Sequence, residues 1–270
     1  MDLPRPRGHA LPRLFAVALL AAVVASGIGS FANPGAVRAS TSDTMEAQLL
    51  KLINDARAAK HLIPLRSWST LTNMAGDRAA TMARNRTLAH ASCLSCQFNS
   101  YGVSRYMAGE VIASSSYPWG SQAAATIFEA WKSSSTHWSM LMSSSFNYIG
   151  LGVALGSNGR TYAAGELTES KDHSKPWLRM NSPSRSGSSV TWSWTGSDLA
   201  LQTHTAGLKN FDVQYRVGSG SWSTIKSGTT MRSLTLTGRA GGHYYGLRVR
   251  ARDNLGLVSS YTAEVRIWVP

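Results

Sequence analysis

Apolar residues recur every three or four positions in three segments of the first half of the chain, a spacing that predicts amphipathic helices. In the first of these segments Leu49 and Ile53 lie one turn apart, and Pro64 stands just beyond its end. The three predicted helices span 45–62, 69–85 and 121–132.

The period changes to two in the rest of the chain, which indicates strands. The first two predicted strands are joined by Asn158-Gly159, a pair typical of tight hairpins. Towards the C-terminus, short alternating segments are separated by Gly, Ser, Asn and Asp residues. The predicted strands span 148–155, 160–166, 190–194, 211–217, 233–236, 244–252 and 261–269.

Helices followed by packed strands predict an α+β architecture for the first half, and regular short strands predict a β-sandwich for the second. The polar stretch 169–178 lies between them and is expected to be a linker. The predicted division is therefore a targeting segment at 1–39, a first domain at 40–168, the linker, and a sandwich at 179–270.

The N-terminal segment has the three parts of a secretory signal: basic residues, the apolar run 14–29, and small residues at a cleavage position. Cleavage is expected after Ala39, with Ala32 as a second candidate, and an uncleaved membrane anchor is the alternative. The basic residues are Arg5, Arg7 and Arg13. We therefore expect a secreted protein that is extracellular or associated with the cell envelope.

The chain carries 27 Lys and Arg against 14 Asp and Glu, a formal net charge of +13. The excess is uneven, because residues 171–270 hold 13 basic and 5 acidic side chains whereas residues 40–170 hold 10 and 8. A strongly basic domain favours an anionic partner. No second long apolar run follows the N-terminal one, which excludes a protein with several membrane spans.

The second half resembles a fibronectin type III domain, an immunoglobulin-like sandwich. The resemblance rests mainly on Tyr245-Gly-Leu247-Arg-Val249-Arg-Ala251, the pattern of that family's strand with the tyrosine corner. It implies that Trp192 or Trp194 and Tyr215 belong to the core.

The first half, from 45 to 168, resembles the CAP superfamily (cysteine-rich secretory proteins, antigen 5 and pathogenesis-related 1) in its bacterial secreted form. Six motifs occur in the family's order. They are Asn54-x-x-Arg57, Ile63-Pro64-Leu65, a helix at 79–91 that ends in His90, Gly109-Glu110-Val111-Ile112, Trp131-x-x-Ser134-x-x-His137, and Ile149-Gly150-x-Gly152. The resemblance implies an α/β/α sandwich.

The CAP resemblance also implies that His90, Glu110 and His137 line one cavity. Two imidazoles and a carboxylate are a normal ligand set for zinc, so Zn²⁺ or another divalent cation is an expected cofactor. A small or lipidic ligand is expected in the same cavity, and a hydrogen-bonded structural triad is the alternative. Ser134 stands where relatives have a second glutamate. Residues 111, 138 and 140, which are polar in relatives, are apolar here, and this predicts a more apolar cavity.

Cys93 and Cys96 are separated by two residues just after His90. In an oxidising compartment this spacing favours a local disulfide. A free or labile pair and a metal site are the alternatives, although a zinc site of cysteines would need a second such pair.

Alternation in the strand 244–252 places one set of arginines outside if the aromatic and aliphatic residues point inward. In the sandwich fold the neighbouring strands share that sheet, which predicts one basic and partly aromatic face. Its members are Arg216, Arg248, Arg250, Arg252, Arg266 and Trp268. The expected partner is an anionic cell-wall polymer, polysaccharide or lipid, and the alternative is an ordinary solvated sheet face.

We therefore expect a monomeric binding protein rather than a catalyst. Nucleic acid is not an expected partner, because the protein is exported and has no recognition helix. Two other functions stay open: a metal-dependent hydrolase or peptidase that uses His90, Glu110 and His137, and a structural adhesin.

Overall fold

The computed structural model describes residues 41–270, with side chains from Asp43 onward. The predicted signal at 1–39 lies outside the described residues. Within them, no helix is long and apolar enough to cross a membrane.

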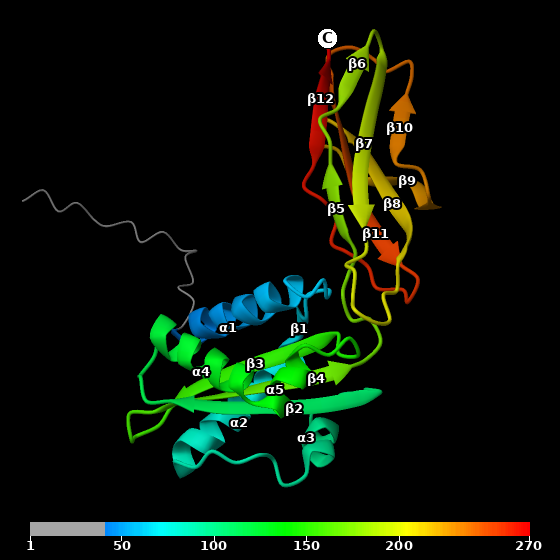
Figure 1. Ribbon diagram of the computed structural model, residues 1–270. Helices are drawn as coiled ribbons and strands as arrows, with labels where there is room; N and C mark the ends of the chain where they lie inside the picture. Colours follow the sequence, from blue (N-terminus) through cyan, green and yellow to red (C-terminus); the bar gives the residue numbers. More distant parts are fainter. Residues whose placement is uncertain (1–40) are drawn as a thin grey trace, which may run out of the picture. The chain divides into compact units, whose positions relative to one another are not determined.

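The first domain has three layers, with a four-stranded sheet between helices (Figure 1). The strand order is β1-β3-β4-β2, in which β1 is parallel to β3 and the other pairs are antiparallel. Helices α1 and α4 cover one face, and α2 covers the other. The elements are α1 (Thr41–Ala58), β1 (Arg66–Ser67), α2 (Ser69–Asn85), α3 (Leu94–Ser100), β2 (Met107–Ser115), α4 (Ser121–Ser133), α5 (Ser135–Leu141), β3 (Tyr148–Leu155) and β4 (Thr161–Glu169).

The helix predicted over 69–85 is confirmed, whereas the prediction of 45–62 was wrong at both ends. Helix α1 begins at Thr41 and ends at Ala58, before His61 adopts a left-handed φ of 56°. Pro64 therefore follows a turn that has already ended the helix. Helices α3 and α5 were not predicted, because seven residues are too few to show a helical period. Strand β2 escaped prediction because both of its faces are buried, which removes the alternation.

The turn after α1 is held by the two polar residues of the first motif. Asn54 exchanges two hydrogen bonds with the backbone of Leu65. The buried guanidinium of Arg57 donates to the carbonyls of Ile63, Leu141 and Ser143, and burial lowers the pKa of Arg57 to about 10. The motif is therefore a structural clamp on this turn.

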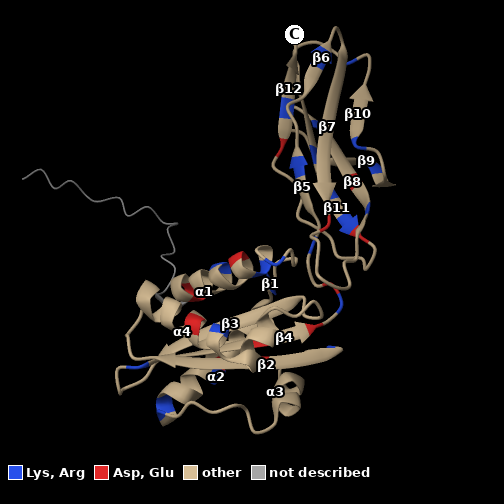
Figure 2. Cartoon of the chain, in the orientation of Figure 1, with Lys and Arg blue, Asp and Glu red and all other residues tan. Residues whose placement is uncertain are grey.

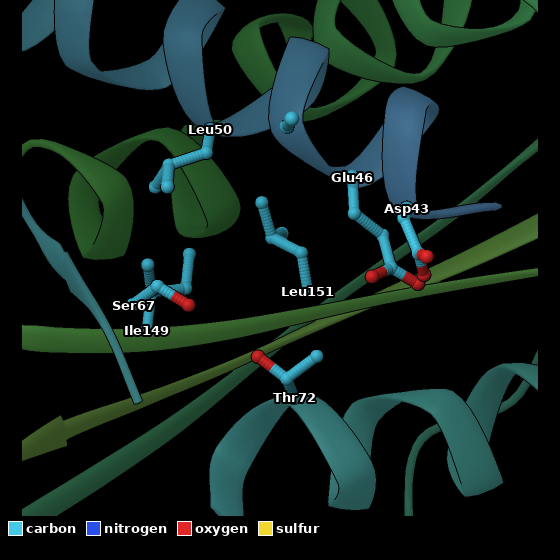
Figure 3. A pocket seen from close by; sticks show the side chains of 8 residues that line it. Asp43, Glu46, Leu50, Ser67, Thr72, Ile149 and Leu151 are labelled. Atoms are coloured by element: carbon cyan, nitrogen blue, oxygen red, sulfur yellow. The ribbon is translucent and has the colours of Figure 1, made fainter. Parts of the chain in front are cut away.

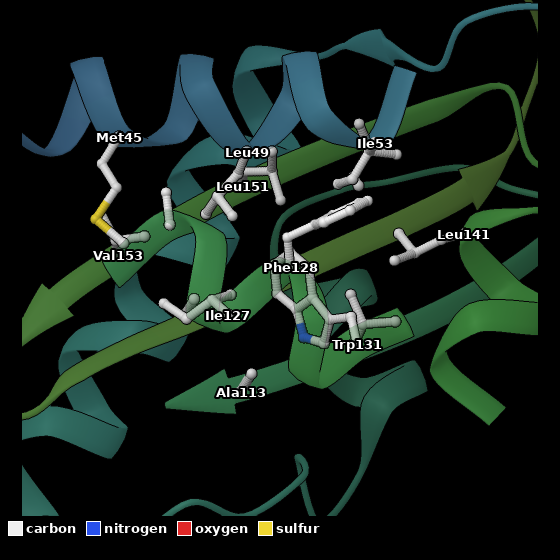
Figure 4. Packing of buried hydrophobic residues seen from close by; sticks show 14 of the residues in the cluster. Met45, Leu49, Ile53, Ala113, Ile127, Phe128, Trp131, Leu141, Leu151 and Val153 are labelled. Atoms are coloured by element: carbon white, nitrogen blue, oxygen red, sulfur yellow. The ribbon is translucent and has the colours of Figure 1, made fainter. Parts of the chain in front are cut away.

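The face of the sheet beneath α1 and α4 carries the apolar core of the domain (Figure 4). Trp131, Ile127 and Phe128 of α4 meet Leu49 and Ile53 of α1 there, and four of these five side chains are fully buried.

The other face of the sheet lies directly against α2. A Cβ atom added to Gly150 of β3 would collide with the backbone of Leu71 in α2. The glycine therefore lets the helix approach the sheet closely. This close approach brings Arg78 of α2 within hydrogen-bond distance of Glu110 in β2.

The second domain is an antiparallel sandwich, which confirms the predicted fold class. One sheet has the order β10-β7-β5 with β6 also paired to β7, and the other has the order β12-β11-β8-β9. The strands are β5 (Trp177–Met180), β6 (Ser184–Ser186), β7 (Ser189–Ser197), β8 (Leu208–Val217), β9 (Ser223–Thr229), β10 (Ser233–Leu236), β11 (His243–Asp253) and β12 (Val265–Val269).

Trp192 and Trp194 are both buried in the core of the sandwich, and the hydroxyl of Tyr245 donates to the carbonyl of Ala240, five residues upstream. The strand predicted over 261–269 was wrong at its start, since β12 begins at Val265. The reason is that the Thr262 hydroxyl accepts the N–H of Val249 in β11, and so replaces the backbone carbonyl of a regular ladder.

The chain between β4 and β5, within the predicted linker, is fixed to Tyr148 of β3. The Tyr148 hydroxyl donates to Asp172, lies 2.8 Å from the hydroxyl of Ser174 and accepts the N–H of His173.

Candidate functional site

A buried carboxylate, Glu110, is the centre of the candidate site. The alternation of β2 turns it towards α2, and the residue is 3% exposed. Its Oε1 accepts a hydrogen bond from Arg78 Nε at 2.8 Å, and its Oε2 accepts the N–H of Ala91 at 3.1 Å. Oε2 also lies 2.5 Å from Nδ1 of His90. Glu110 therefore ties the loop after α2 to the sheet.

The helix that the CAP resemblance places at 79–91 was wrong at its end, because α2 ends at Asn85 and His90 lies on the loop after it. The imidazole of His90 is presented to solvent. Helix α2 ends in a left-handed residue, Arg86, and the Arg78 guanidinium also donates to the carbonyl of Ala89. The side chain of His90 is 54% exposed although its Nδ1 partner is buried. When Nδ1 donates to Glu110, the neutral ring keeps an acceptor at Nε2.

His137 reaches the same place from α5. Ser134 is the N-cap of this helix, and its hydroxyl accepts the N–H of His137. The spacing between the two residues is therefore that of a cap and the third helical position. The Nε2 atoms of His137 and His90 are 3.5 Å apart. Burial, and then the neighbouring His90, lower the pKa of His137, and Glu110 acts in the opposite direction.

The structure thus brings His90, Glu110 and His137 together, but not as three ligands around one point. Both oxygens of Glu110 accept hydrogen bonds from protein donors, and a catalytic zinc site uses three protein ligands. Across the described part of the chain, no group of three His, Cys, Asp or Glu residues is placed to hold a metal ion. The present arrangement does not fit the expected set of zinc ligands, because Glu110 orients His90 and does not serve as the third ligand.

A second buried acid, Glu166, was missed by the sequence analysis. It lies in β4 in register with Glu110 of β2 on one side and Gly150 of β3 on the other. It is fully buried, and neither carboxylate oxygen has a hydrogen-bond partner within the described structure. Burial, and then the charge of Glu110, raise the pKa of Glu166 to about 8, against the effect of Arg78. The raised pKa favours the protonated form of this carboxyl at neutral pH. The signal in the sequence that could have revealed this residue was an acidic residue within an otherwise apolar strand.

The prediction of a more apolar cavity was wrong. Val111 follows Glu110 in β2 and points to the opposite face, where it belongs to the apolar core. Trp138 and Met140 pack against that same core. The three substitutions relative to the family pattern therefore do not line the site.

Cys93 and Cys96 form a disulfide at the start of α3, and both residues are exposed. They line a pocket of about 450 Å³ together with Arg78 and His90. This volume is within the roughly 300 to 1,000 Å³ that is usual for small-molecule sites. A disulfide that closes so short a loop stabilises the fold by only about 2 kcal/mol in the chain-entropy treatment.

A second cavity, of about 210 Å³, lies between α1, β3 and α2 (Figure 3). Leu50, Ile149 and Leu151 give it apolar walls, and Glu46 lies among them. Burial raises the pKa of Glu46 to about 7, against the N–H of Val153 that its carboxylate accepts. The cavity is smaller than the roughly 300 Å³ at which pockets for drug-sized ligands begin.

On the sandwich, arginines and aromatic rings alternate on the outer face of the β12-β11-β8-β9 sheet. The guanidinium carbons of Arg216 and Arg248 lie 4.6 and 4.4 Å from the ring centre of Trp222. Those of Arg248 and Arg250 lie 4.6 and 4.9 Å from the ring centre of Tyr261. Arg248 therefore lies on both rings, and the five side chains form one ladder.

The same face continues onto β12. Arg266 lies 4.9 Å from the ring centre of Tyr244, and that ring is 5.0 Å from the ring of Trp268. The basic residues of β11 and β12 are marked in blue in Figure 2. We call this surface the arginine–aromatic face; it comprises Arg216, Arg248, Arg250, Arg252, Arg266, Trp222, Tyr244, Tyr261 and Trp268.

Two acids partly neutralise the arginine–aromatic face, which the sequence analysis did not anticipate. Glu264 accepts hydrogen bonds from the guanidinium of Arg216, and these bonds are the main reason that the pKa of Glu264 is lowered. Asp212 pairs with Arg250 at 2.9 Å and lies 3.7 Å from Arg252. Five arginines against these two acids leave a formal charge of +3.

Fold and site define a protein with an α/β/α sandwich domain, which carries an oriented histidine on a loop, and a following β-sandwich. Residues 50–166 match the model of the CAP family, the cysteine-rich secretory protein family. The chain therefore carries a CAP domain. A search of curated proteins gave no match.

Among solved structures, a cysteine-rich secretory protein from Staphylococcus aureus is similar with 21% identity and a TM-score of 0.39, over 48% of this chain and 40% of that one. An outer surface protein from Borrelia burgdorferi is similar with 21% identity and a TM-score of 0.42, over 47% and 94% of the two chains. An Fn3-like protein from Clostridium thermocellum is similar with 24% identity and a TM-score of 0.27, over 36% and 96%. This chain thus spans about two fifths of the Staphylococcus protein.

Proposed function

We propose that this protein is a secreted, extracellular binding protein that its sandwich domain retains on an anionic envelope polymer. The arginine–aromatic face is the observation that carries this proposal. The guanidinium carbons of three arginines lie 4.4 to 4.9 Å from the ring centres of Trp222 and Tyr261, and these contacts restrict the side chains, so less side-chain entropy remains to be lost when a polymer binds. Restricted guanidinium groups suit phosphate and carboxylate groups, which they bind through paired hydrogen bonds.

The residual charge favours the same class of partner. After the pairs with Glu264 and Asp212 are counted, the face keeps a net positive charge, and aromatic rings beside it offer stacking surfaces to sugars. A poly(glycerol phosphate) that carries sugar substituents presents both features, and the unsubstituted chain presents the regular charge. Binding through exposed charges is screened by salt, so retention should fall as ionic strength rises.

The test is retention of the whole secreted chain on immobilised poly(glycerol phosphate). A variant with Arg248→Gln and Arg266→Gln is compared with a matched variant that carries Arg179→Gln and Arg185→Gln, two exposed arginines on the other sheet. The first variant should bind about tenfold more weakly, as expected if two charge contacts of about 0.7 kcal/mol each are lost. The matched variant should keep its affinity. Equal weakening of both would show that total charge decides retention, and would contradict the proposal.

For the CAP domain we propose that His90 and His137 bind a small polar ligand, since an imidazole with a fixed Nδ1 offers a well-directed Nε2. Seven of the twelve residues that line the neighbouring pocket have polar side chains, Arg78 and His90 among them, which favours a ligand with polar groups. Titration with Zn²⁺ alone, in the wild type and in a His90→Ala/His137→Ala variant, tests the metal alternative. Stoichiometric binding that the variant loses would overturn our proposal and reopen the hydrolase hypothesis.

A further inference from the structure

The Cys93–Cys96 disulfide lies at the surface and joins residues that are already close in the sequence, so it contributes little as a structural cross-link. Its two cysteines are exposed, and the loop that it closes contains only two intervening residues. The start of α3 is also held by backbone bonds, because the N–H of Gln97 donates to the carbonyl of Cys93. Two exposed cysteines that line a pocket of about 450 Å³ are accessible to another molecule.

We propose that this disulfide is a thiol–disulfide exchange site for small polar thiols, an activity that goes beyond polymer retention and beyond the ligand binding proposed at the two histidines. The proposal rests on the exposed cysteine pair and on the pocket that it shares with His90 and Arg78. These are the two side chains with basic groups among the described residues that line the pocket, and none of those residues is acidic. Glu110 accepts a hydrogen bond from Arg78 and lies against Nδ1 of His90, and Nε2 of His90 stays exposed to a polar thiol that carries a carboxylate, such as glutathione.

The two sulfur atoms have different surroundings. Sγ of Cys93 accepts the backbone N–H of Cys96 at 3.2 Å, and it lies 3.6 Å from the hydroxyl of Ser95. Hydrogen bonds to sulfur stabilise the thiolate form of a cysteine. In the reduced protein, Cys93 is therefore the nucleophile, and Cys96 is the cysteine that resolves the intermediate.

The exchange needs only a thiol and disulfide couple. The Cys93 thiolate attacks one sulfur of a small disulfide, so a Cys93 mixed disulfide forms and one small thiolate leaves. The Cys96 thiolate then attacks the Cys93 sulfur, which restores the protein disulfide and releases the second thiolate. The protein loses two electrons, the small disulfide gains them, and the two protons of the cysteine thiols pass through solvent to the released thiolates. Two small thiols drive the reverse reaction.

The first experiment follows the whole chain in buffers of graded reduced-to-oxidised glutathione ratio, with alkylation and mass spectrometry as the readout. We expect the disulfide to open and close reversibly while circular dichroism shows an unchanged fold. Opening only in the presence of a denaturant, or loss of the fold when the disulfide opens, would assign the bond a structural role and overturn the proposal.

The second experiment compares single-cysteine variants in their reaction with oxidised glutathione. Cys96→Ser keeps Cys93 and should form the mixed disulfide about three- to tenfold faster than Cys93→Ser, because the lower pKa of the Cys93 thiol increases its thiolate fraction. The difference stays this small because a lower pKa also makes the thiolate a weaker nucleophile. Equal rates, or a faster Cys93→Ser variant, would contradict the assignment of Cys93. Cystamine, a cationic small disulfide, should react more slowly than oxidised glutathione with Cys96→Ser, and the reverse order would contradict the proposed substrate class.

Discussion

Replacement of Glu166 by glutamine should change how the stability of the protein depends on pH. The carboxyl is fully buried in β4, in register with Glu110, and glutamine has nearly the same shape without the ability to ionise. Burial and the charge of Glu110 raise the pKa of Glu166 from 4.5 to about 8 in the folded state. In the unfolded chain the carboxyl returns to its ordinary value.

The sign of the effect follows from proton binding. Between pH 4.5 and about 8 the folded protein keeps a proton on Glu166 that the unfolded chain has released, so the free energy of unfolding falls as pH rises. Each pH unit in this interval costs up to about 1.4 kcal/mol, which gives about 5 kcal/mol as an upper limit. Glutamine removes this loss. Glu166→Gln should therefore have nearly wild-type stability at low pH and be more stable by about 2–5 kcal/mol above pH 8.

Urea unfolding of both proteins at about pH 5, 7 and 9 measures the difference. Glu46→Gln is the matched control: the pKa of Glu46 is raised only to about 7, so its advantage should be smaller and should level off at a lower pH. If the gap between Glu166→Gln and the wild type were the same at all three pH values, Glu166 would not titrate as described and the reasoning would fail.

Glu110→Ala should cost about 3–5 kcal/mol in urea unfolding, because it leaves the largely buried guanidinium of Arg78 without its carboxylate; a loss below about 1 kcal/mol would contradict this account. Gly150→Ala should cost at least about 2–3 kcal/mol in thermal unfolding, since the new methyl group would meet the backbone of Leu71. Gly76→Ala in α2, where an added Cβ meets nothing within 4 Å, should leave stability unchanged or raise it, and similar losses in both variants would contradict the close-packing argument.

The sequence predicted long elements better than short or fully buried ones. Helix α2 was predicted to the residue because its buried positions keep a helical period along the helix, from Leu71 to Ala83. Strand β2 has five consecutive buried residues, so it carries no alternation that a pattern could detect. The end of α1 depends on the left-handed turn at His61, which Pro64 suggested only indirectly.

The candidate site was predicted from family motifs, and its geometry was not. The spacing from Ser134 to His137 is local, so the sequence contains it in full as a helix cap. The bonds from Arg78 and Ala91 to Glu110 join residues far apart in the chain, and no local pattern encodes them. For this reason the motifs predicted Glu110 as a ligand, whereas in the structure Glu110 orients His90.

The two faces of the first sheet explain where chemistry is possible in this domain. The face under α1 and α4 is filled by aromatic and aliphatic side chains, which offer a ligand mainly apolar surface. On the face under α2, the close approach at Gly150 places Arg78, Glu110 and Glu166 together, and a salt bridge beside a second buried acid is costly to bury. Buried polar groups of this kind commonly position another side chain. Here the hydrogen bonds run from Arg78 through Glu110 to the exposed imidazole of His90. The site therefore belongs to the α2 side of the sheet, and the arrangement of charges, more than any single motif, identifies it.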